Sequence, residues 1–266
     1  MLRRILVALD GSPSSLVAAG AGCGLARRGR SFVQGLVFAE PAHGASDAGD
    51  GSGREPAKLA FRREAERNGL AAFAIREAEE GPLGAIRHAA IDHDLVVLGR
   101  ESMLDVNGEL CALSLCVDRI IRDEPRPVLL VPEASSTADA GVTEAPVLVA
   151  FDDSPASSRT LHMFALLGLA DGRTVHVITL DPASERQAEA TAARACSLLR
   201  HHGAADAHAI GRDAGAPQDA ILETAGALGA GMIVMGAYGT RGIREIFGSC
   251  TRAVLHAAPV PLFLHH

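Results

Sequence analysis

Aromatic side chains are scarce in this sequence of 266 residues, where they make up 3% of the total, with one tyrosine and no tryptophan. Few aromatic rings leave few platforms on which the bases of a single-stranded nucleic acid can stack. Basic residues are also in the minority, 25 against 32 acidic residues, for a formal net charge of −7 at pH 7. Binding to nucleic-acid phosphates favours the opposite sign. We therefore expect no nucleic-acid partner.

Long apolar runs are missing as well. No run reaches the roughly 18 residues of a membrane-spanning helix, so no membrane segment is expected. The apolar run at residues 5–9 ends at Asp10 and is not expected to be a signal peptide. The 5 cysteines are odd in number and form no CxxC pair, which argues against a disulfide framework or a zinc site. Reduced, buried thiols in a cytoplasmic protein are the simpler interpretation.

The common catalytic motifs are absent too. The sequence has no G-x-x-x-x-G-K-[ST] phosphate loop and no G-x-S-x-G nucleophile elbow. We find no convincing nucleophile and base pair and no convincing set of metal ligands, so we assign no catalytic residue and no metal site.

The sequence does contain an internal repeat, because three motifs occur twice in the same order. The pairs are residues 5–15 with 147–157, 95–99 with 232–236, and 127–131 with 261–265. The stretch at 134–144 is small, polar and aperiodic, as a linker is. We therefore predict two tandem domains, residues 1–133 and 145–266.

Short apolar runs alternate with helical patterns in both halves. The predicted strands are 4–9, 32–38, 72–77, 94–99, 127–131, 146–151, 174–180, 205–210, 232–236 and 261–265. The predicted helices are 13–29, 55–70, 82–91, 109–123, 155–170, 184–202, 217–228 and 249–257. The runs at 95–98 and 232–235 are apolar throughout, which indicates strands buried on both faces of a parallel sheet. The fold class is α/β, with doubly wound sheets that bind ligands at the carboxyl ends of their strands.

Glycines and hydroxyls follow one strand of the second half. Gly236 ends the strand at 232–236, Gly239 and Gly242 follow it, and Gly248-Ser249 stands where a helix should begin. Ser249 and Thr251 offer hydroxyls, and Arg241, Arg244 or Arg252 could add a contact to a phosphate oxygen. Free N–H groups at a helix N-terminus suit a phosphate, and a flexible turn with an ordinary N-cap is the alternative.

Asp10 and Asp152 each follow the first strand of their half. Such a carboxylate can accept hydrogen bonds from a ribose or a base, or can simply anchor a helix start. With Asp153, Asp152 could also hold Mg²⁺, although adjacent side chains diverge.

The first half has lost this arrangement. Ser102 stands in place of the second glycine, and no Gly-Ser pair opens the next helix. Glu101, Asp105 and Glu109 would repel a triphosphate. The second half is therefore the predicted binding half.

These motifs resemble the universal stress protein family in its tandem two-domain form. The resemblance rests on the V-A-x-D-x-S-P start of each half, on the strands that end at Gly99 and Gly236, and on the glycine segment up to Ser249. The spacer 240–247 has eight residues where the family pattern G-x2-G-x9-G-[S/T] has nine. The resemblance implies, for each half, a five-stranded parallel sheet of the adenine nucleotide alpha hydrolase type with strand order 3-2-1-4-5. It also implies pairing of the two domains within the chain, and it allows a homodimer.

The resemblance further implies that the second domain binds ATP or AMP, with Mg²⁺ as an option, for sensing or regulation. The site residues that it implies are Ala150, Phe151, Asp152, Leu180, Met235, Gly236, Gly239, Gly248, Ser249 and Cys250. No arginine finger or general base is evident, so any ATP hydrolysis should be slow. The alternatives are a nucleotide-free scaffold that acts through protein–protein contacts and, less favoured, an enzyme for a small anionic ligand.

Overall fold

The computed structural model describes residues 1–38, 54–106, 109–112, 120–121, 126–135, 144–213, 215–237 and 248–266. The chain divides into two compact units, Arg3–Asp139 and Ala140–His266, and Met1 and Leu2 group with the second. We call these units the N-terminal and the C-terminal domain. Among the described helices, none combines the length and the apolar character that a membrane crossing requires.

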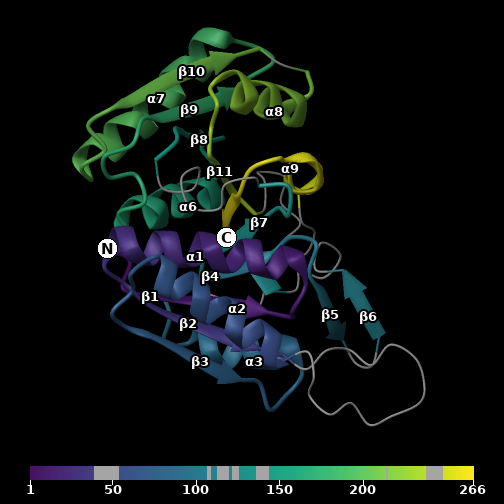
Figure 1. Ribbon diagram of the computed structural model, residues 1–266. Coiled ribbons are helices and arrows are strands. Elements are labelled where there is room, and N and C mark those ends of the chain that lie inside the picture. Colours follow the sequence, from purple (N-terminus) through teal and green to yellow (C-terminus); the bar gives the residue numbers. More distant parts are fainter. Residues whose placement is uncertain are drawn as a thin grey trace. The chain divides into compact units, whose positions relative to one another are not determined.

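The N-terminal domain alternates strands and helices along the chain (Figure 1). Its strands are β1 (Arg4–Leu9), β2 (Phe32–Val37), β3 (Phe73–Glu77), β4 (Leu95–Gly99), β5 (Met103–Val106), β6 (Glu109–Ala112) and β7 (Val128–Val131). Its helices include α1 (Pro13–Gly29), α2 (Arg54–Arg67) and α3 (Pro82–Ala90). The parallel strands follow the order β3-β2-β1-β4-β7, which is the predicted order 3-2-1-4-5.

The C-terminal domain repeats this plan. Its strands are β8 (Val147–Ala150), β9 (Val175–Leu180), β10 (Ala207–Arg212), β11 (Met232–Gly236) and β12 (Leu262–His265). Its helices are α6 (Pro155–Leu166), α7 (Glu185–His201), α8 (Pro217–Ala227) and α9 (Ser249–Ala257). The strands are parallel in the order β10-β9-β8-β11-β12, so the predicted order is confirmed here too. Right-handed crossovers place α6 and α7 on one face of the sheet and α8 and α9 on the other.

The first helix of each domain begins for the same local reason. Ser12 and Ser154 are the N-caps, and their hydroxyls accept hydrogen bonds from the backbone N–H of Ser15 and Ser157. A proline follows each cap, where its missing N–H costs no hydrogen bond. The Ser-Pro repeat seen in the sequence is therefore a repeated helix start.

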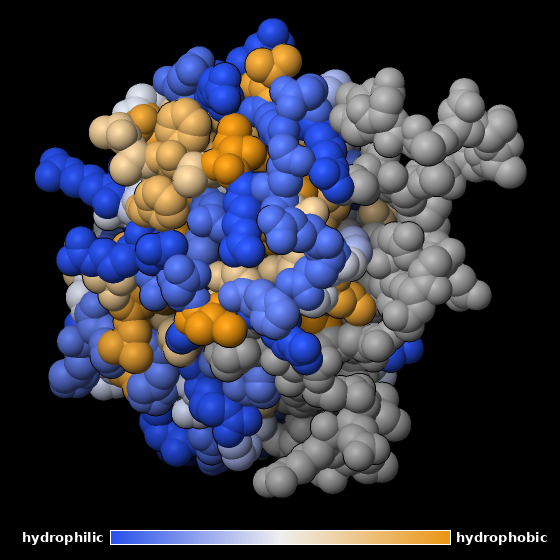
Figure 2. Space-filling model, turned by 90° about the horizontal axis from the view of Figure 1, so that it is seen from below, coloured by the Kyte–Doolittle hydropathy of each residue, from blue (hydrophilic) through white to orange (hydrophobic). Residues whose placement is uncertain are grey.

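Aliphatic side chains build the core, as the low aromatic content predicts. The strands β4 and β11 are buried along nearly their whole length. In the C-terminal domain the rings of Phe164 and Phe263 meet edge to face, with centroids 5.8 Å apart. Hydrophilic residues cover much of the face seen from below, with separate hydrophobic patches between them (Figure 2).

Three predicted helices differ from the structure, and the one predicted at 55–70 ends at Arg67. The helix predicted at 109–123 is wrong at its start, because residues 109–112 form β6, which pairs antiparallel with β5. The sequence carries the competing signal, since Asn107-Gly108 between two short apolar runs is typical of a hairpin. The helix predicted at 155–170 ends at Leu166, because Gly168 adopts a φ of +72° that a helix cannot continue.

Candidate functional site

The candidate site lies at the carboxyl edge of the sheet in the C-terminal domain. There β8 and β11 are neighbours, and the register pairs Ala150 with Met235. The chain leaves β8 towards β9 on one side, whereas β11 leads to β12 on the other. The strand order therefore reverses between β8 and β11, which is where sheets of this kind bind ligands.

Asp152 anchors the loop that leads from β8 into α6. Its Oδ1 accepts a hydrogen bond of 3.1 Å from the backbone N–H of Ser154, the N-cap of α6. Among the described residues none donates to its Oδ2, and the side chain is exposed. The carboxylate of Asp152 can thus anchor the loop through Oδ1 and still accept a hydrogen bond from a ligand through Oδ2.

The neighbouring residue Asp153 forms an ion pair with helix α7. It has a φ of +60°, which aspartate tolerates better than most residues, and it pairs with Arg194 at 2.7 Å. A Mg²⁺ site formed by Asp152 and Asp153 stays a prediction.

The end of β11 is held close to the start of α6. A Cβ atom on Gly236 would lie 3.0 Å from the backbone nitrogen of Ser157 and 3.1 Å from the carbonyl carbon of Ala156. Only glycine avoids this close contact with main-chain atoms. The glycine that ends the strand is thus needed for packing as well as for approach by a ligand.

Helix α9 is fixed onto the same strand end. The hydroxyl of Thr251 donates to the carbonyl oxygen of Gly236 at 3.1 Å, and the N–H of Gly248 donates to Ala237 at 3.4 Å. The N-cap of α9 is Gly248, which has no side chain, and none of the described residues caps the helix. Within the described part of the chain, the first N–H groups of α9, with their partial positive charge, are therefore without a capping partner, as an anion site requires.

The carboxylate of Asp152, which follows β8, acts on the thiol of Cys250 in the first turn of α9. Burial raises the pKa of this thiol, and the carboxylate of Asp152 raises it further. The thiol thus stays protonated near neutral pH, and the charge of Asp152 acts on the first turn of α9. The C-terminal domain therefore brings a carboxylate and an uncapped helix N-terminus together at one strand switch.

Most of the predicted site residues meet at this edge. Ala150, Phe151, Met235, Gly248 and Ser249 join Asp152, Gly236 and Cys250 there. Leu180 ends β9, two residues beyond Ile178, which is the register partner of Ala150. Gly239 lies outside the described residues.

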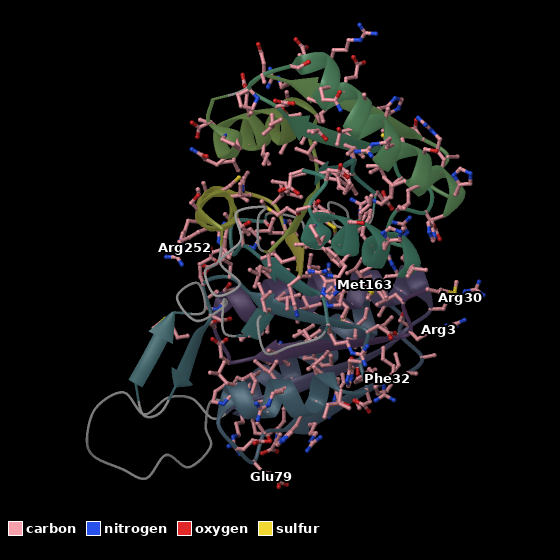
Figure 3. The ribbon with its side chains drawn as sticks, turned by 180° about the vertical axis from the view of Figure 1, so that it is seen from behind. Arg3, Arg30, Phe32, Glu79, Met163 and Arg252 are labelled. Atoms are coloured by element: carbon pink, nitrogen blue, oxygen red, sulfur yellow. The ribbon has the colours of Figure 1, made fainter. Side chains whose placement is uncertain are left out.

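Thr251 is the residue whose structural use the sequence did not indicate. Its hydroxyl was a candidate phosphate donor, but the hydrogen bond to Gly236 occupies it. Arg252, another candidate, lies on α9 and points away from the domain (Figure 3).

The equivalent edge of the N-terminal domain is filled by the chain itself. Asp10 Oδ1 accepts hydrogen bonds from the N–H and the hydroxyl of Ser12, at 3.0 and 2.6 Å. Asp10 Oδ2 accepts one of 2.8 Å from the N–H of Met103, the first residue of β5. The segment that enters the hairpin β5–β6 thus crosses the end of β1 and bonds one oxygen of the aspartate, while Ser12 bonds the other.

Glu101 adds a second closure in the N-terminal domain. Its Oε2 accepts hydrogen bonds from the hydroxyl of Ser14 at 3.0 Å and from the N–H of Glu133 at 2.9 Å. Burial raises the pKa of Glu101, but the hydrogen bonds from Glu133 and Arg100 outweigh that effect and lower it. The carboxylate of Glu101, which follows β4, is therefore ionised. It links the end of β4 to the start of α1 and to the segment after β7.

Comparison with known families gives a match in the second domain. The model of the Universal stress protein family matches residues 145–266, in agreement with the resemblance seen in that half of the sequence. Comparison with curated proteins found no match.

Solved structures share the fold over nearly the whole chain. A universal stress protein from Archaeoglobus fulgidus is 18% identical over 98% of this chain and 95% of that one, with a TM-score of 0.69. A functionally unknown protein from Pseudomonas aeruginosa is 19% identical over 99% of this chain and 92% of that one, with a TM-score of 0.58. A universal stress protein from A. fulgidus in complex with dAMP is 29% identical over 45% of this chain and 96% of that one, with a TM-score of 0.36.

Proposed function

We propose that this chain, whose residues 145–266 belong to the universal stress protein family, binds an adenine nucleotide at the carboxyl edge of β8 and β11. The observation that supports this most is the uncapped N-terminus of α9, which Thr251 holds against the end of β11 beside Asp152. A phosphate suits the helix N-terminus, and a sugar or base suits the carboxylate.

In this proposal, separate groups of residues contact the adenosine, the ribose and the phosphates. Ala150, Phe151 and Leu180 face the adenosine, and Asp152 Oδ2 accepts hydrogen bonds from ribose hydroxyls or the base amino group. Met235 and Gly236 line the ribose. The N–H groups of Gly239, Gly248, Ser249 and Cys250, with the hydroxyl of Ser249, bind the phosphates of ATP or AMP. Any Mg²⁺ would enter with these phosphates.

The bound nucleotide serves as a signal in this proposal, in a cytoplasmic protein. The sequence offers no evident general base or arginine finger, both of which fast phosphoryl transfer relies on. Hydrolysis of ATP should therefore be slow at most, and occupancy of the site should report the nucleotide level.

The test is to release nucleotide from the purified full chain with acid and to identify it by mass spectrometry and absorbance. We expect ATP or AMP at about one per chain, since a tightly bound ligand stays with the folded state. Calorimetry should then show that Ser249→Ala weakens binding by about tenfold, the effect of losing one charge-assisted hydrogen bond. Gly239→Val should weaken it more, because the bulk would block close approach of the phosphates.

Ser197→Ala is the matched control. Ser197 is an exposed serine of α7 on the other side of the domain from α9, so its loss should leave affinity unchanged. The proposal fails if no nucleotide is released and millimolar ATP does not raise the melting temperature.

A nucleotide-free scaffold is the second candidate function. Two observations favour it: the eight-residue spacer 240–247 and the N-terminal domain, whose own chain fills the corresponding edge. In that case Ser249→Ala and Gly239→Val would change stability only slightly, and protein partners would be the next object of study.

A further inference from the structure

A pair of histidines lies at the amino end of β9 and β10, away from the candidate nucleotide site. His176 and His208 are register partners on these neighbouring parallel strands. Side chains of register partners leave the same face of a sheet. Their rings are stacked, with centroids 5.1 Å apart and an interplanar angle of 25°. Two imidazoles thus stand side by side on one face.

A carboxylate orients one of the two rings. Asp206 Oδ1 lies 2.7 Å from Nε2 of His208, and Asp206 Oδ2 accepts a hydrogen bond of 2.6 Å from the hydroxyl of Thr174. The hydroxyl of Thr174 and the ring of His208 thus hold the two oxygens of Asp206 in place from opposite sides of the carboxyl group. A carboxylate on one imidazole nitrogen fixes the ring and strengthens the other nitrogen as a metal ligand.

One member of the pair is open to solvent and the other is half-buried. The side chains of His208 and Asp206 are 54% and 56% exposed, whereas His176 is half-buried. Helix α8 covers the other end of β10, where Arg212 donates to Glu223 and Thr224 at 3.2 and 3.3 Å. An ion can therefore reach the histidines without any movement of α8.

We propose that His176 and His208 bind a divalent ion of the class that prefers imidazole, namely Cu²⁺, Ni²⁺ or Zn²⁺, with Asp206 as the orienting residue. Among the described residues no group of three His, Cys, Asp or Glu side chains is arranged to hold a metal, so water completes the coordination. The bound ion bridges β10, an edge strand of this sheet, to β9.

The experiment uses the full chain, with Cu²⁺ for spectroscopy, because imidazole sites bind Cu²⁺ most tightly among these ions, and with Ni²⁺ for affinities. Pulsed electron paramagnetic resonance counts the coordinated imidazoles, and Ni²⁺ calorimetry gives affinities without oxidation of thiols. We expect two imidazoles in the wild type and one in His208→Ala, with an affinity at least about tenfold weaker. Asp206→Asn should keep both imidazoles and weaken binding by about tenfold or more.

A second histidine pair provides the matched control. The rings of His162 and His202 are 6.3 Å apart and nearly perpendicular, and Nδ1 of His162 lies 2.8 Å from the carbonyl oxygen of Ser158. His202→Ala should therefore leave the two-imidazole signal and the affinity unchanged. His208 is exposed, so its variant should fold, which circular dichroism checks. The proposal is overturned if His208→Ala binds Ni²⁺ as tightly as the wild type or if the wild type shows fewer than two imidazoles.

Discussion

Glycines control how closely main-chain segments approach in the C-terminal domain. On β10 a Cβ atom at Gly211 would lie 2.4 Å from the nitrogen of Glu189 and 2.6 Å from the carbonyl oxygen of Glu185, both in α7. Main-chain atoms of a helix cannot turn aside as a flexible side chain can. Helix α7 therefore rests on β10 only because position 211 has no side chain.

We predict that Gly211→Ala lowers the free energy of unfolding by about 1–3 kcal/mol, because the added methyl group forces α7 away from β10. The matched control is Gly226→Ala in α8, where an added Cβ meets nothing within 4 Å. There the alanine should stabilise the protein by up to about 1 kcal/mol through its better helix propensity. Urea denaturation measures both, and equal effects of the two changes would contradict the prediction.

Among the elements, the sequence predicts strands and helix starts well because the signals are local. The apolar runs give β4 and β11, and Ser-Pro gives the starts of α1 and α6. The sequence does not predict the hairpin β5–β6, because the helical pattern at 109–123 competes with the turn signal of Asn107-Gly108.

The candidate site shows the same division between local and tertiary signals. Asp152, Gly236 and Gly248 could be found from strand ends and glycine spacing. The hydrogen bond from Thr251 to Gly236 and the three-segment link through Glu101 could not, because each joins elements that only the tertiary fold brings together.

The Glu101 link predicts an acid-sensitive N-terminal domain. The folded pKa of Glu101 lies below its ordinary value of 4.5, so its contribution to stability is complete above pH 4.5 and is lost as the pH falls through the lowered value. Glu101→Gln should cost about 1 kcal/mol at pH 7, because charge-assisted hydrogen bonds are lost from a partly solvated group. The difference between variant and wild type should shrink at acid pH.

Denaturation curves recorded from pH 7 down to pH 3 measure this difference. Glu79→Gln is the control, because Glu79 is exposed and points away from the domain (Figure 3). A difference between Glu101→Gln and the wild type that stays constant over the whole pH range would show that the charge of Glu101 has no part in the link.

At the scale of the whole molecule, one fold occurs twice, and the contacts at the carboxyl ends of the strands differ between the two domains. Both domains have the strand order 3-2-1-4-5 and the same Asp-x-Ser-Pro start. In the N-terminal domain Asp10 accepts a hydrogen bond from Met103, whereas in the C-terminal domain the carboxylate of Asp152 raises the pKa of Cys250 in α9. The sequence predicted this difference from Ser102 and the acidic residues that follow Gly99, although not the contacts that produce it.

We therefore predict that aspartate variants of the two domains differ in their affinity for adenine nucleotide. Asp152→Asn should weaken adenine nucleotide binding by about tenfold, because the amide removes the charge that accepts ribose or base donors. Asp10→Asn should leave affinity and stoichiometry unchanged, and so should Asp153→Asn, whose side chain pairs with Arg194. Calorimetry with ATP measures all three, and a loss of binding in Asp10→Asn would place the nucleotide in the wrong domain.

The closure of the N-terminal edge by Met103 gives this protein a built-in reference. Every solution of the chain holds the open and the closed version of one fold at equal concentration, under identical pH, salt and temperature. In a backbone NMR titration with a nucleotide, amide signals around Asp10 should stay in place while those around Asp152 move. Non-specific effects of the added salt would shift both sets alike, so the difference between them isolates true binding in a single sample.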